Sequence, residues 1–186
     1  MEATAIRAVS APTKIDWIDI ARDLGPRFAA RAAEVDEEDL FVSENFAELK
    51  SSGLVAAGVP AELGGGGASH AELGAVLQEL GRHCGSTALA FAMHTHQVAT
   101  AGWRWRHQQA PVEGLLKRVA GEGIVILSSG GSDWLQGSGA ATRVDGGFRI
   151  NARKVFASGA PAGNLLMTSA VYDDPEAGPT VLHFGV

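Results

Sequence analysis

The chain has 186 residues, of which 46% are hydrophobic, 19% are charged and 24 are glycine. This composition excludes a disordered chain, a collagen and a disulfide scaffold, because apolar residues suffice for a core and one cysteine is present. The net charge is −6, and the sequence has no stripe of lysine and arginine that could neutralise phosphates. We therefore do not expect binding to nucleic acid.

The first predicted helix runs from about residue 14 to residue 33, where apolar side chains recur at helical spacing. Thr13 and Asp16 form a start that resembles a capping box. Pro26 lies too deep for a first-turn proline, so we expect it to kink this helix or to mark a restart at Gly25.

A shorter helix is predicted over residues 44–52, with Ser43 as its N-cap and Gly53 as its C-terminal stop. Residues 54–68 combine a proline with four consecutive glycines, which helix and strand interiors tolerate poorly. This segment is therefore predicted to be a loop.

Ser69 followed by Glu72 is a capping box, and it predicts a helix that ends by Gly85. The next helix is expected to begin after a cap at Ser86 or Thr87. Small or apolar residues surround nearly its whole circumference, so we expect a central helix packed on all sides.

A last helix is predicted over residues 112–120, introduced by Pro111 and closed by Gly121 and Gly123. From residue 124 the pattern changes to that of strands. Strands are predicted at residues 124–128, 140–144, 148–158, 165–171 and 180–186.

Turn residues separate these strands. Asp145, Gly146 and Gly147 predict a hairpin, and Ser128–Asp133 is predicted to be a loop. In the strand predicted over 148–158, Lys154 falls on the same face as apolar residues, so only part of the alternation separates an inner face from an outer face.

The order of elements predicts an α+β fold with two domains. Residues 1–122 would form an antiparallel helical bundle, and residues 123–186 would form an incomplete antiparallel β-barrel-like domain. The last predicted strand continues to the final residue without a cap, so we expect the chain to be a fragment of a longer polypeptide.

Cys84 cannot form an internal disulfide, and the N-terminus has neither a basic start nor a long apolar run, so a cytoplasmic protein is expected. The most apolar long stretch, residues 86–103, is interrupted by His94 and His96, so we expect no membrane span.

Four features in this order resemble the flavin-dependent acyl-CoA dehydrogenases. They are the segment GVPAELGGGG at 58–67, GSD at 131–133, RK-x-F-A-S-G at 153–159, and the change from helices to strands between the first segment and the other two. The first segment is similar to the family's G-x-x-x-P-E-E-Y-G-G-x-G loop. The resemblance covers about residues 14–186 and implies FAD as the cofactor.

The resemblance also implies which residues contact the cofactor. Phe156 would lie against the flavin ring, and the Ser158 hydroxyl would approach N5, the atom that accepts hydride. Ser132 matches a family serine that contacts both flavin and the thioester end of the substrate. The full predicted set of cofactor contacts is Leu127, Ser128, Ser129, Ser132, Phe156, Ala157 and Ser158.

One departure from the family pattern leaves alternatives open. The family usually has T-E-P-x-A-G-S-D where this chain has ILSSGGSD, and Ser128 or Ser129 could replace the threonine hydroxyl. The resemblance implies α,β-desaturation of an acyl-CoA thioester in fatty acid metabolism. The missing Thr-Glu-Pro also fits a flavin-dependent monooxygenase of the same superfamily, and a third possibility is a non-catalytic fragment or binding module.

No residue of this chain matches the family's catalytic base, which lies in a C-terminal helical domain. The resemblance implies a homo-oligomer, either dimer or tetramer, and electron-transfer flavoprotein or another electron acceptor as a partner.

No metal site is expected, since His94 and His96 are two residues apart and point to different faces of one helix. We expect one of them in the core and one near a helix interface; the alternative is that one reaches the acyl pocket.

Overall fold

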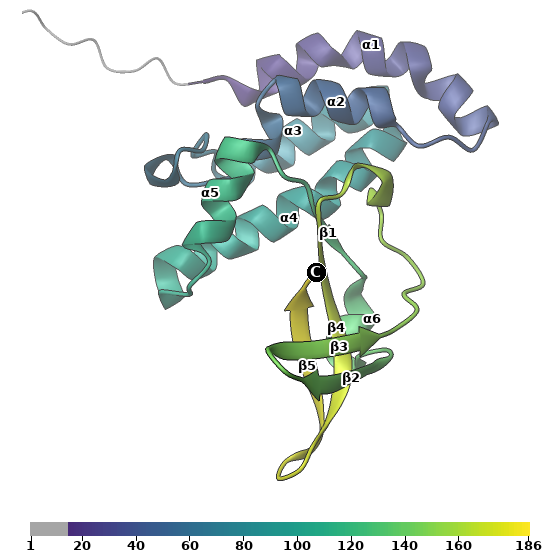
Figure 1. Cartoon of the computed structure of the whole chain (residues 1–186). Helices are drawn as coiled ribbons and strands as arrows, with labels where there is room; N and C mark the ends of the chain where they lie inside the picture. The colour runs from purple at the N-terminus through teal and green to yellow at the C-terminus, as the bar shows by residue number, and fades with distance from the viewer. Residues whose placement is uncertain (1–14) are drawn as a thin grey trace, which may run out of the picture.

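The computed structural model describes residues 15–186, which form a helical part followed by a part rich in strands (Figure 1). The helical part contains α1 (Trp17–Glu37), α2 (Ser43–Ser51), the 3₁₀ turns η1 (Leu54–Ala56) and η2 (Ala61–Leu63), α3 (His70–His83), α4 (Gly85–Gln108) and α5 (Glu113–Glu122). The second part contains β1 (Ile126–Ser128), α6 (Gly131–Gln136), β2 (Ala140–Val144), β3 (Gly147–Asn151), η3 (Ala160–Ala162), β4 (Leu165–Asp174) and β5 (Gly178–Gly185). This order confirms the α+β prediction.

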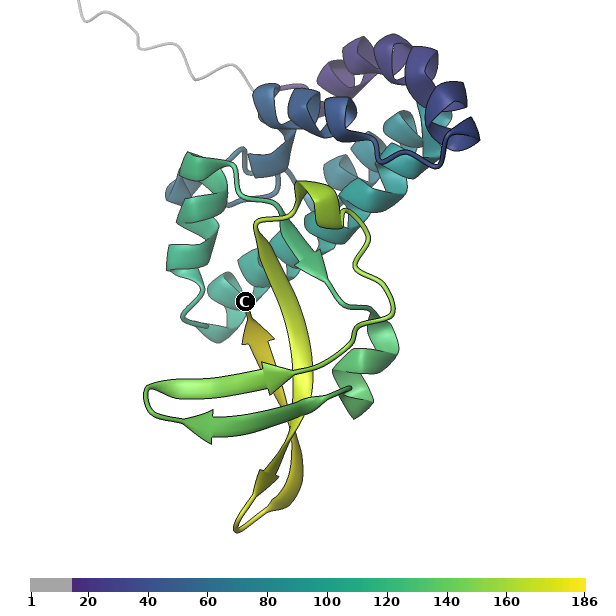
Figure 2. The same cartoon turned by 45° about the vertical axis from the view of Figure 1, so that its right-hand side comes forward.

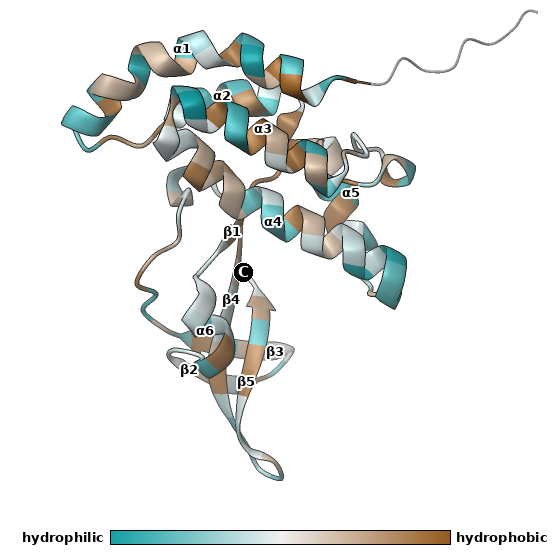
Figure 3. Cartoon of the chain, turned by 180° about the vertical axis from the view of Figure 1, so that it is seen from behind, coloured by the Kyte–Doolittle hydropathy of each residue, from teal (hydrophilic) through white to brown (hydrophobic). Residues whose placement is uncertain are grey.

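Helix α1 begins after Asp16, whose carboxylate accepts hydrogen bonds from the backbone N–H groups of Ile18 and Asp19. The predicted cap residue Thr13 lies outside the described residues. Figure 3 shows hydrophobic and hydrophilic bands alternating along this helix, as its predicted helical periodicity requires.

The predicted restart at Gly25 is wrong, because one continuous helix contains Pro26 and extends to Glu37. The kink at Pro26 stays a prediction. Gly25 is buried within this helix and has a packing role. A Cβ atom at this position would lie 2.3 Å from the His83 ring of α3. The glycine therefore allows α1 and α3 to pack closely and does not end a helix.

The ends of the next two helices follow their predicted signals, with one correction. Ser43 is the first residue of α2 and not its cap, and the preceding Val42 has no side-chain acceptor to offer. Gly53 follows this helix with a φ of 82°, which favours glycine. At the start of α3, Ser69 and Glu72 form the predicted capping box.

The glycine-rich loop between α2 and α3 is a packed part of the helical core. The segment predicted to be a plain loop contains η1 and η2, and its Val59 side chain is fully buried. A Cβ atom at Gly66 would lie 2.2 Å from Trp17 Cζ2 and 2.9 Å from Ala57 Cα. Glycine is required here because the loop backbone passes directly against α1.

Helix α4 is central, but it is not covered on all sides, which corrects the sequence prediction. It begins at Gly85, before the predicted caps, and buries Phe91, His94 and Val98. On another face Leu89 is 62% exposed and Trp103 is 46% exposed. Small and apolar residues allow every face of α4 to be buried, but within residues 15–186 other elements pack against only part of its surface.

The sheet is open and mixed. Strand β4 pairs antiparallel with β5 along one edge, and β2 pairs antiparallel with β3, as predicted. Along the other edge of β4, β1 and β2 lie one after the other and both run parallel to it. The purely antiparallel sheet expected from the sequence is wrong in these two pairings. The long excursion through α6, β2, β3 and η3 returns the chain to its starting end, so β4 runs in the direction of β1.

The β2–β3 hairpin crosses in front of the β4–β5 hairpin in Figures 1 and 2. Its turn contains Gly146, with a φ of 78°. Strand β3 ends at Asn151, so the strand predicted to continue to residue 158 is too long. The predicted loop Ser128–Asp133 is also corrected, because its second half begins helix α6.

A buried histidine joins the helical part to the first strand. His94 Nε2 donates a hydrogen bond to the Val55 carbonyl at 2.8 Å, and Nδ1 accepts one from the Ile126 N–H at 3.0 Å. Burial lowers the pKa of His94 to about 4, although the hydrogen bond to Val55 opposes this shift. The imidazole is therefore neutral at pH 7 and links the loop after α2 to the start of β1.

None of the helices within residues 15–186 combines the length and the apolar character that a membrane crossing requires.

We predict that Gly66→Ala lowers the free energy of unfolding by about 1–3 kcal/mol, because the new methyl group meets Trp17 and the backbone of Ala57. The control is Gly74→Ala in α3, where a Cβ atom meets nothing within 4 Å. That variant should be neutral or more stable by about 0.5–1 kcal/mol. Urea unfolding measures both, and equal stabilities would contradict the close packing.

We predict a pH dependence that originates at His94. Its pKa is about 4 in the folded protein and about 6.5 when unfolded, so protonation favours the unfolded chain. Stability should therefore fall as the pH decreases from about 6.5 to about 4, by at most roughly 3 kcal/mol. His94→Gln should reduce this dependence in urea unfolding curves, and the exposed control His107→Gln should retain it. If His94→Gln leaves the pH dependence of the unfolding free energy unchanged, that dependence does not originate at His94.

Candidate functional site

The candidate site forms where one edge of β4 lacks a strand partner. Strand β1 pairs with β4 up to Met167, and β2 pairs with it from Val171. Between them lie Thr168, Ser169 and Ala170, all buried. Buried backbone groups need hydrogen-bond partners, so the gap must be filled by side chains or by irregular backbone.

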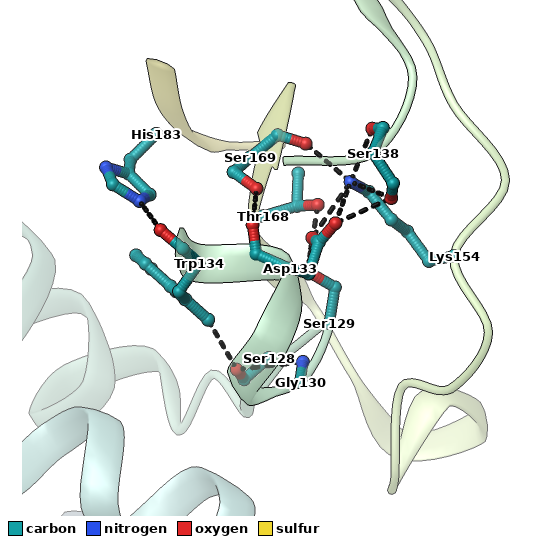
Figure 4. A network of polar contacts seen from close by, with 10 residues as sticks. All are labelled: Ser128, Ser129, Gly130, Asp133, Trp134, Ser138, Lys154, Thr168, Ser169 and His183. Carbon is teal, nitrogen blue, oxygen red and sulfur yellow. Dashed lines mark hydrogen bonds and ion pairs between the residues drawn. The ribbon is translucent and has the colours of Figure 1, made fainter. Parts of the chain in front are cut away.

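An ion pair between Asp133 and Lys154 fills this gap (Figure 4). Lys154 Nζ lies 2.8 Å from Asp133 Oδ2, and the two side chains are 12% and 9% exposed. The ammonium also donates to the Ser138 carbonyl, at 2.9 Å, and to the Ser169 carbonyl on β4. The Asp133 backbone carbonyl accepts a hydrogen bond from the Ser169 hydroxyl.

The carboxylate of Asp133 is ionised in this environment. Burial by itself would raise its pKa, but hydrogen bonds from Lys154, Ser129 and Ser138, together with the charge of Lys154, outweigh burial and hold the pKa well below its usual range. The Ser138 hydroxyl donates to Oδ1 at 2.6 Å. The pair is therefore a fully hydrogen-bonded, charged group within the sheet.

The turn between β1 and α6 separates two cavities. The first, here called the α3–α4 cavity, has a volume of about 610 Å³. The second, here called the Lys154 cavity, has a volume of about 340 Å³. Gly130 and Gly131 line both. Because glycine has no side chain, these two residues expose backbone to both spaces.

The two cavities differ in chemistry. The α3–α4 cavity is mainly apolar, and its lining includes Leu73, Leu77, Ala92, Met93, Ala99 and Trp134. The Lys154 cavity is more polar, and its lining includes Ser129, Ser132, Asp133, Ser138, Lys154 and Phe156. One turn therefore presents its backbone to an apolar space on one side and a polar space on the other.

The structure separates the two serines that follow β1. The Ser128 hydroxyl accepts a hydrogen bond from Trp134 Nε1 at 3.1 Å and lies at the α3–α4 cavity. The Ser129 hydroxyl donates to Asp133 and lies 3.0 Å from the Thr168 hydroxyl, so it is held inside the gap. Ser132 is exposed and lines the Lys154 cavity.

The other predicted contact residues lie near the same turn. Phe156 lines the Lys154 cavity and is 70% exposed. Leu127 is buried and packs against the glycines of the η3 region, since a Cβ atom at Gly159 would lie 3.4 Å from its Cδ2. Ala157 and Ser158 lie between Phe156 and Gly159 and line neither of these two cavities.

The two histidines of α4 have different surroundings. His94 belongs to the core and makes the bridge described above. His96 is exposed and lines the α3–α4 cavity. Within residues 15–186, no group of three or more His, Cys, Asp or Glu side chains is placed to hold a metal ion.

Sequence reasoning missed three residues of this site: Asp133, Lys154 and Trp134. Trp134 stacks on His183 with ring centroids 4.6 Å apart and forms one wall of the α3–α4 cavity. A signal existed for Lys154, because its position among apolar residues on one face of a predicted strand requires a buried partner. No local pattern indicates that this partner is Asp133, 21 residues away.

Comparison with known proteins places these features in a family. The family model described as "Acyl-CoA dehydrogenase, N-terminal domain" matches residues 19–122. L-evernosamine nitrososynthase from Micromonospora sp. is 31% identical over 167 residues, which cover 86% of this chain and 39% of the relative. Cyclohex-1-ene-1-carbonyl-CoA dehydrogenase from Geobacter metallireducens is 33% identical over 173 residues, which cover 87% and 43%.

A relative with another activity and a solved protein extend the comparison. Dibenzothiophene monooxygenase from Mycolicibacterium goodii is 30% identical over 89% of this chain and 41% of the relative. KijD3 in complex with dTDP has a TM-score of 0.81 at 28% identity, covering 97% of this chain and 47% of that chain. Its complex with FMN and a dTDP-linked amino sugar has a TM-score of 0.75 at 27% identity, covering 95% and 46%. The present chain thus spans less than half the length of these proteins.

We predict that Asp133→Asn lowers the free energy of unfolding by about 3–5 kcal/mol, because it leaves the Lys154 ammonium buried without its counter-charge. The matched control is Glu113→Gln, which breaks an exposed pair with Lys117 in α5. That change should cost less than about 1 kcal/mol. Urea unfolding measures the difference, and equal costs would show that the Asp133 pair is not buried in solution.

Proposed function

This chain belongs to the acyl-CoA dehydrogenase family, and we propose from that premise that it supplies flavin and substrate contacts to a flavin-dependent oxidoreductase. Members of the family are flavoproteins that include dehydrogenases, monooxygenases and nitrososynthases. We propose FAD as the cofactor, and we propose that residues 1–122 and 123–186 are its two domains.

The residues around the Lys154 cavity fit a flavin. Phe156 exposes 70% of its surface, and a Cβ atom on Gly130 would lie 3.9 Å from its Cδ2, so the aromatic ring lies beside the glycine turn. A flat aromatic group placed there would cover exposed apolar surface and meet backbone groups that no side chain obstructs. When bound, a flavin supplies two-electron redox chemistry by accepting hydride.

Each predicted contact residue then has a distinct role in the proposal. Phe156 covers one face of the ring, the exposed Ser158 hydroxyl is a donor to its edge, and Ser132 contacts both flavin and substrate. Leu127 packs against Gly159 and so supports the segment that carries Phe156 and Ser158. We also propose Ser128, Ser129 and Ala157 as cofactor contacts. Ser129 lines the Lys154 cavity, Ser128 lies at the α3–α4 cavity on the other side of the turn, and Ala157 follows Phe156.

The observation that carries the proposed substrate class is the apolar α3–α4 cavity on the other side of the same turn. Its volume and lining suit a hydrocarbon chain, with the reacting end at the turn. We propose that the substrate is an acyl-CoA thioester and that the reaction is α,β-desaturation, in which the α-carbon loses a proton and the β-carbon loses a hydride. No residue of this chain is assigned as the base. Electron-transfer flavoprotein or another acceptor as partner, and assembly as a homo-oligomer, belong to the same proposal.

A flavin-dependent monooxygenase is the second candidate, and a specific observation favours it. The turn after β1 lacks the family's Thr-Glu-Pro, and the hydroxyls that could replace the threonine already have partners: Ser128 accepts from Trp134, and Ser129 donates to Asp133. The likeness to dibenzothiophene monooxygenase from Mycolicibacterium goodii supports the same candidate, and KijD3 was solved with FMN. FMN is accordingly the alternative cofactor.

We predict that the purified chain binds FAD or FMN weakly and that Phe156→Ala raises the dissociation constant at least about fivefold, because stacking of one aromatic side chain on a flat heterocycle is worth about 1–3 kcal/mol. Flavin fluorescence measures the affinity. The control is Leu135→Ala, which removes an apolar side chain that is 82% exposed and does not line the Lys154 cavity.

The same titration tests the substrate class. Octanoyl-CoA should perturb the absorption spectrum of the bound flavin, whereas CoA without an acyl chain should not. A flavin spectrum that is indifferent to both would favour the monooxygenase. Equal effects of Phe156→Ala and Leu135→Ala, or the absence of binding at millimolar flavin, would contradict the proposed flavin contacts.

A further inference from the structure

The segment that carries Phe156 is held to the rest of the protein by few interactions. After β3 ends at Asn151, no backbone hydrogen bond joins residues 152–158 to a neighbouring strand in the part of the chain that the structure describes. The Ala157 carbonyl accepts from the N–H of Ala160, which is a local turn. Sheet pairing therefore does not determine where this segment lies.

Burial of apolar side chains does not hold the segment either. Val155 is 84% exposed and Phe156 is 70% exposed. The chain is packed again only at Gly159, which is buried beside Leu127. Between the end of β3 and this glycine, Lys154 and Ala157 are half-buried, and the Lys154 side chain, at 12% exposed, is the long one.

Lys154 connects the segment to three other elements. Its ammonium donates to the Asp133 carboxylate on α6, to the Ser138 carbonyl before β2 and to the Ser169 carbonyl on β4 (Figure 4). An ammonium has three N–H donors, so each element takes one. In the described residues, apart from the local turn into η3, these are the hydrogen bonds that join residues 152–158 to other elements.

We infer that Lys154 is a positioning residue, whose ammonium anchors the segment 155–158 beside the Gly130 turn and so presents Phe156 and Ser158 to the cofactor. The anchoring follows from the contacts of Lys154, whereas the identity of the cofactor rests on the proposed function. Without the anchor the segment gains conformations, and binding must then bear the entropy cost of ordering it.

The anchor can be tested without any ligand by limited proteolysis with chymotrypsin, with cleavage after Phe156 quantified by mass spectrometry. Lys154→Met keeps the length of the side chain and removes the three donors. We expect the rate of cleavage after Phe156 to rise at least about tenfold, because cleavage follows the population of the open segment. Synthetic peptides spanning residues 152–160, with Lys or Met at position 154, correct for the intrinsic preference of the protease.

Two controls separate anchoring from other effects. Lys117→Met removes an exposed lysine of α5 and should leave the cleavage rate unchanged. Phe184→Ala removes a ring that contacts Phe148 with centroids 5.7 Å apart, and so weakens the sheet without touching Lys154. Under native conditions this variant should lose stability with no comparable rise in cleavage after Phe156.

Lys154→Arg provides a graded test if the methionine variant does not fold. Its guanidinium keeps the charge for Asp133, but no single nitrogen of it can donate to Asp133, Ser138 and Ser169 together, because each terminal nitrogen has two N–H groups that lie in one plane. Cleavage should then be intermediate between the wild type and a fully open segment. The inference is overturned if a folded Lys154→Met protein is cleaved after Phe156 at the wild-type rate. If Lys154→Met does not fold, it is overturned when Lys154→Arg is cleaved at the wild-type rate.

Flavin titration of the same variants distinguishes the two proposals. The role in positioning the cofactor contacts predicts that Lys154→Met binds flavin more weakly than the wild type. Lys154→Arg should recover part of this affinity, and Lys117→Met should bind as tightly as the wild type. A wild type that binds no flavin, together with faster cleavage in Lys154→Met, would reject the flavin site and retain the anchor. Unchanged flavin affinity in a Lys154→Met protein with an open segment would reject the role in binding.

Discussion

The candidate site depends on an interruption in the pairing of one strand. Strands β1 and β2 share a single edge of β4 but do not meet, so at Thr168–Ala170 this edge has no partner strand, although β5 pairs with the opposite edge. Buried backbone groups at such an edge are costly unless they are hydrogen-bonded. The Lys154 ammonium donates to the Ser169 carbonyl at this edge, and the Asp133 backbone carbonyl accepts from the Ser169 hydroxyl. Both residues line the Lys154 cavity. The same interruption in the sheet thus requires a buried ion pair and creates the space beside it.

The position of the glycine turn is determined from both ends of β1. At the start of the strand, His94 accepts a hydrogen bond from Ile126 and thereby joins it to α4 and to the loop after α2. At its end, the Ser129 N–H donates to the Met167 carbonyl. A three-residue strand held at both ends places the following turn between the helices and the sheet. That placement sets an apolar cavity on one side of the turn and a polar cavity on the other.

Predictions from the sequence succeeded where the signal is local. The capping box of Ser69 and the Asp145–Gly147 hairpin each require only neighbouring residues, and both are present. Predictions failed where a distant segment decides the outcome. A restart of the first helix at Gly25 was one of two expected outcomes, but the helix that packs against α3 is continuous. The strand expected to reach residue 158 ends at Asn151, where its pairing with β2 ends.

The sequence by itself determined the α+β order, most helix ends, the family resemblance and the candidate contacts Ser132 and Phe156. Only the tertiary structure decided that β1 and β2 both run parallel to β4, that Ser128 and Ser129 face different surroundings, and that Lys154 meets Asp133. The physical reason is the range of the interactions. Caps and turns are satisfied within a few residues, whereas a buried charge or an unpaired strand edge is satisfied by groups far away along the chain, which only the folded arrangement brings within hydrogen-bond distance.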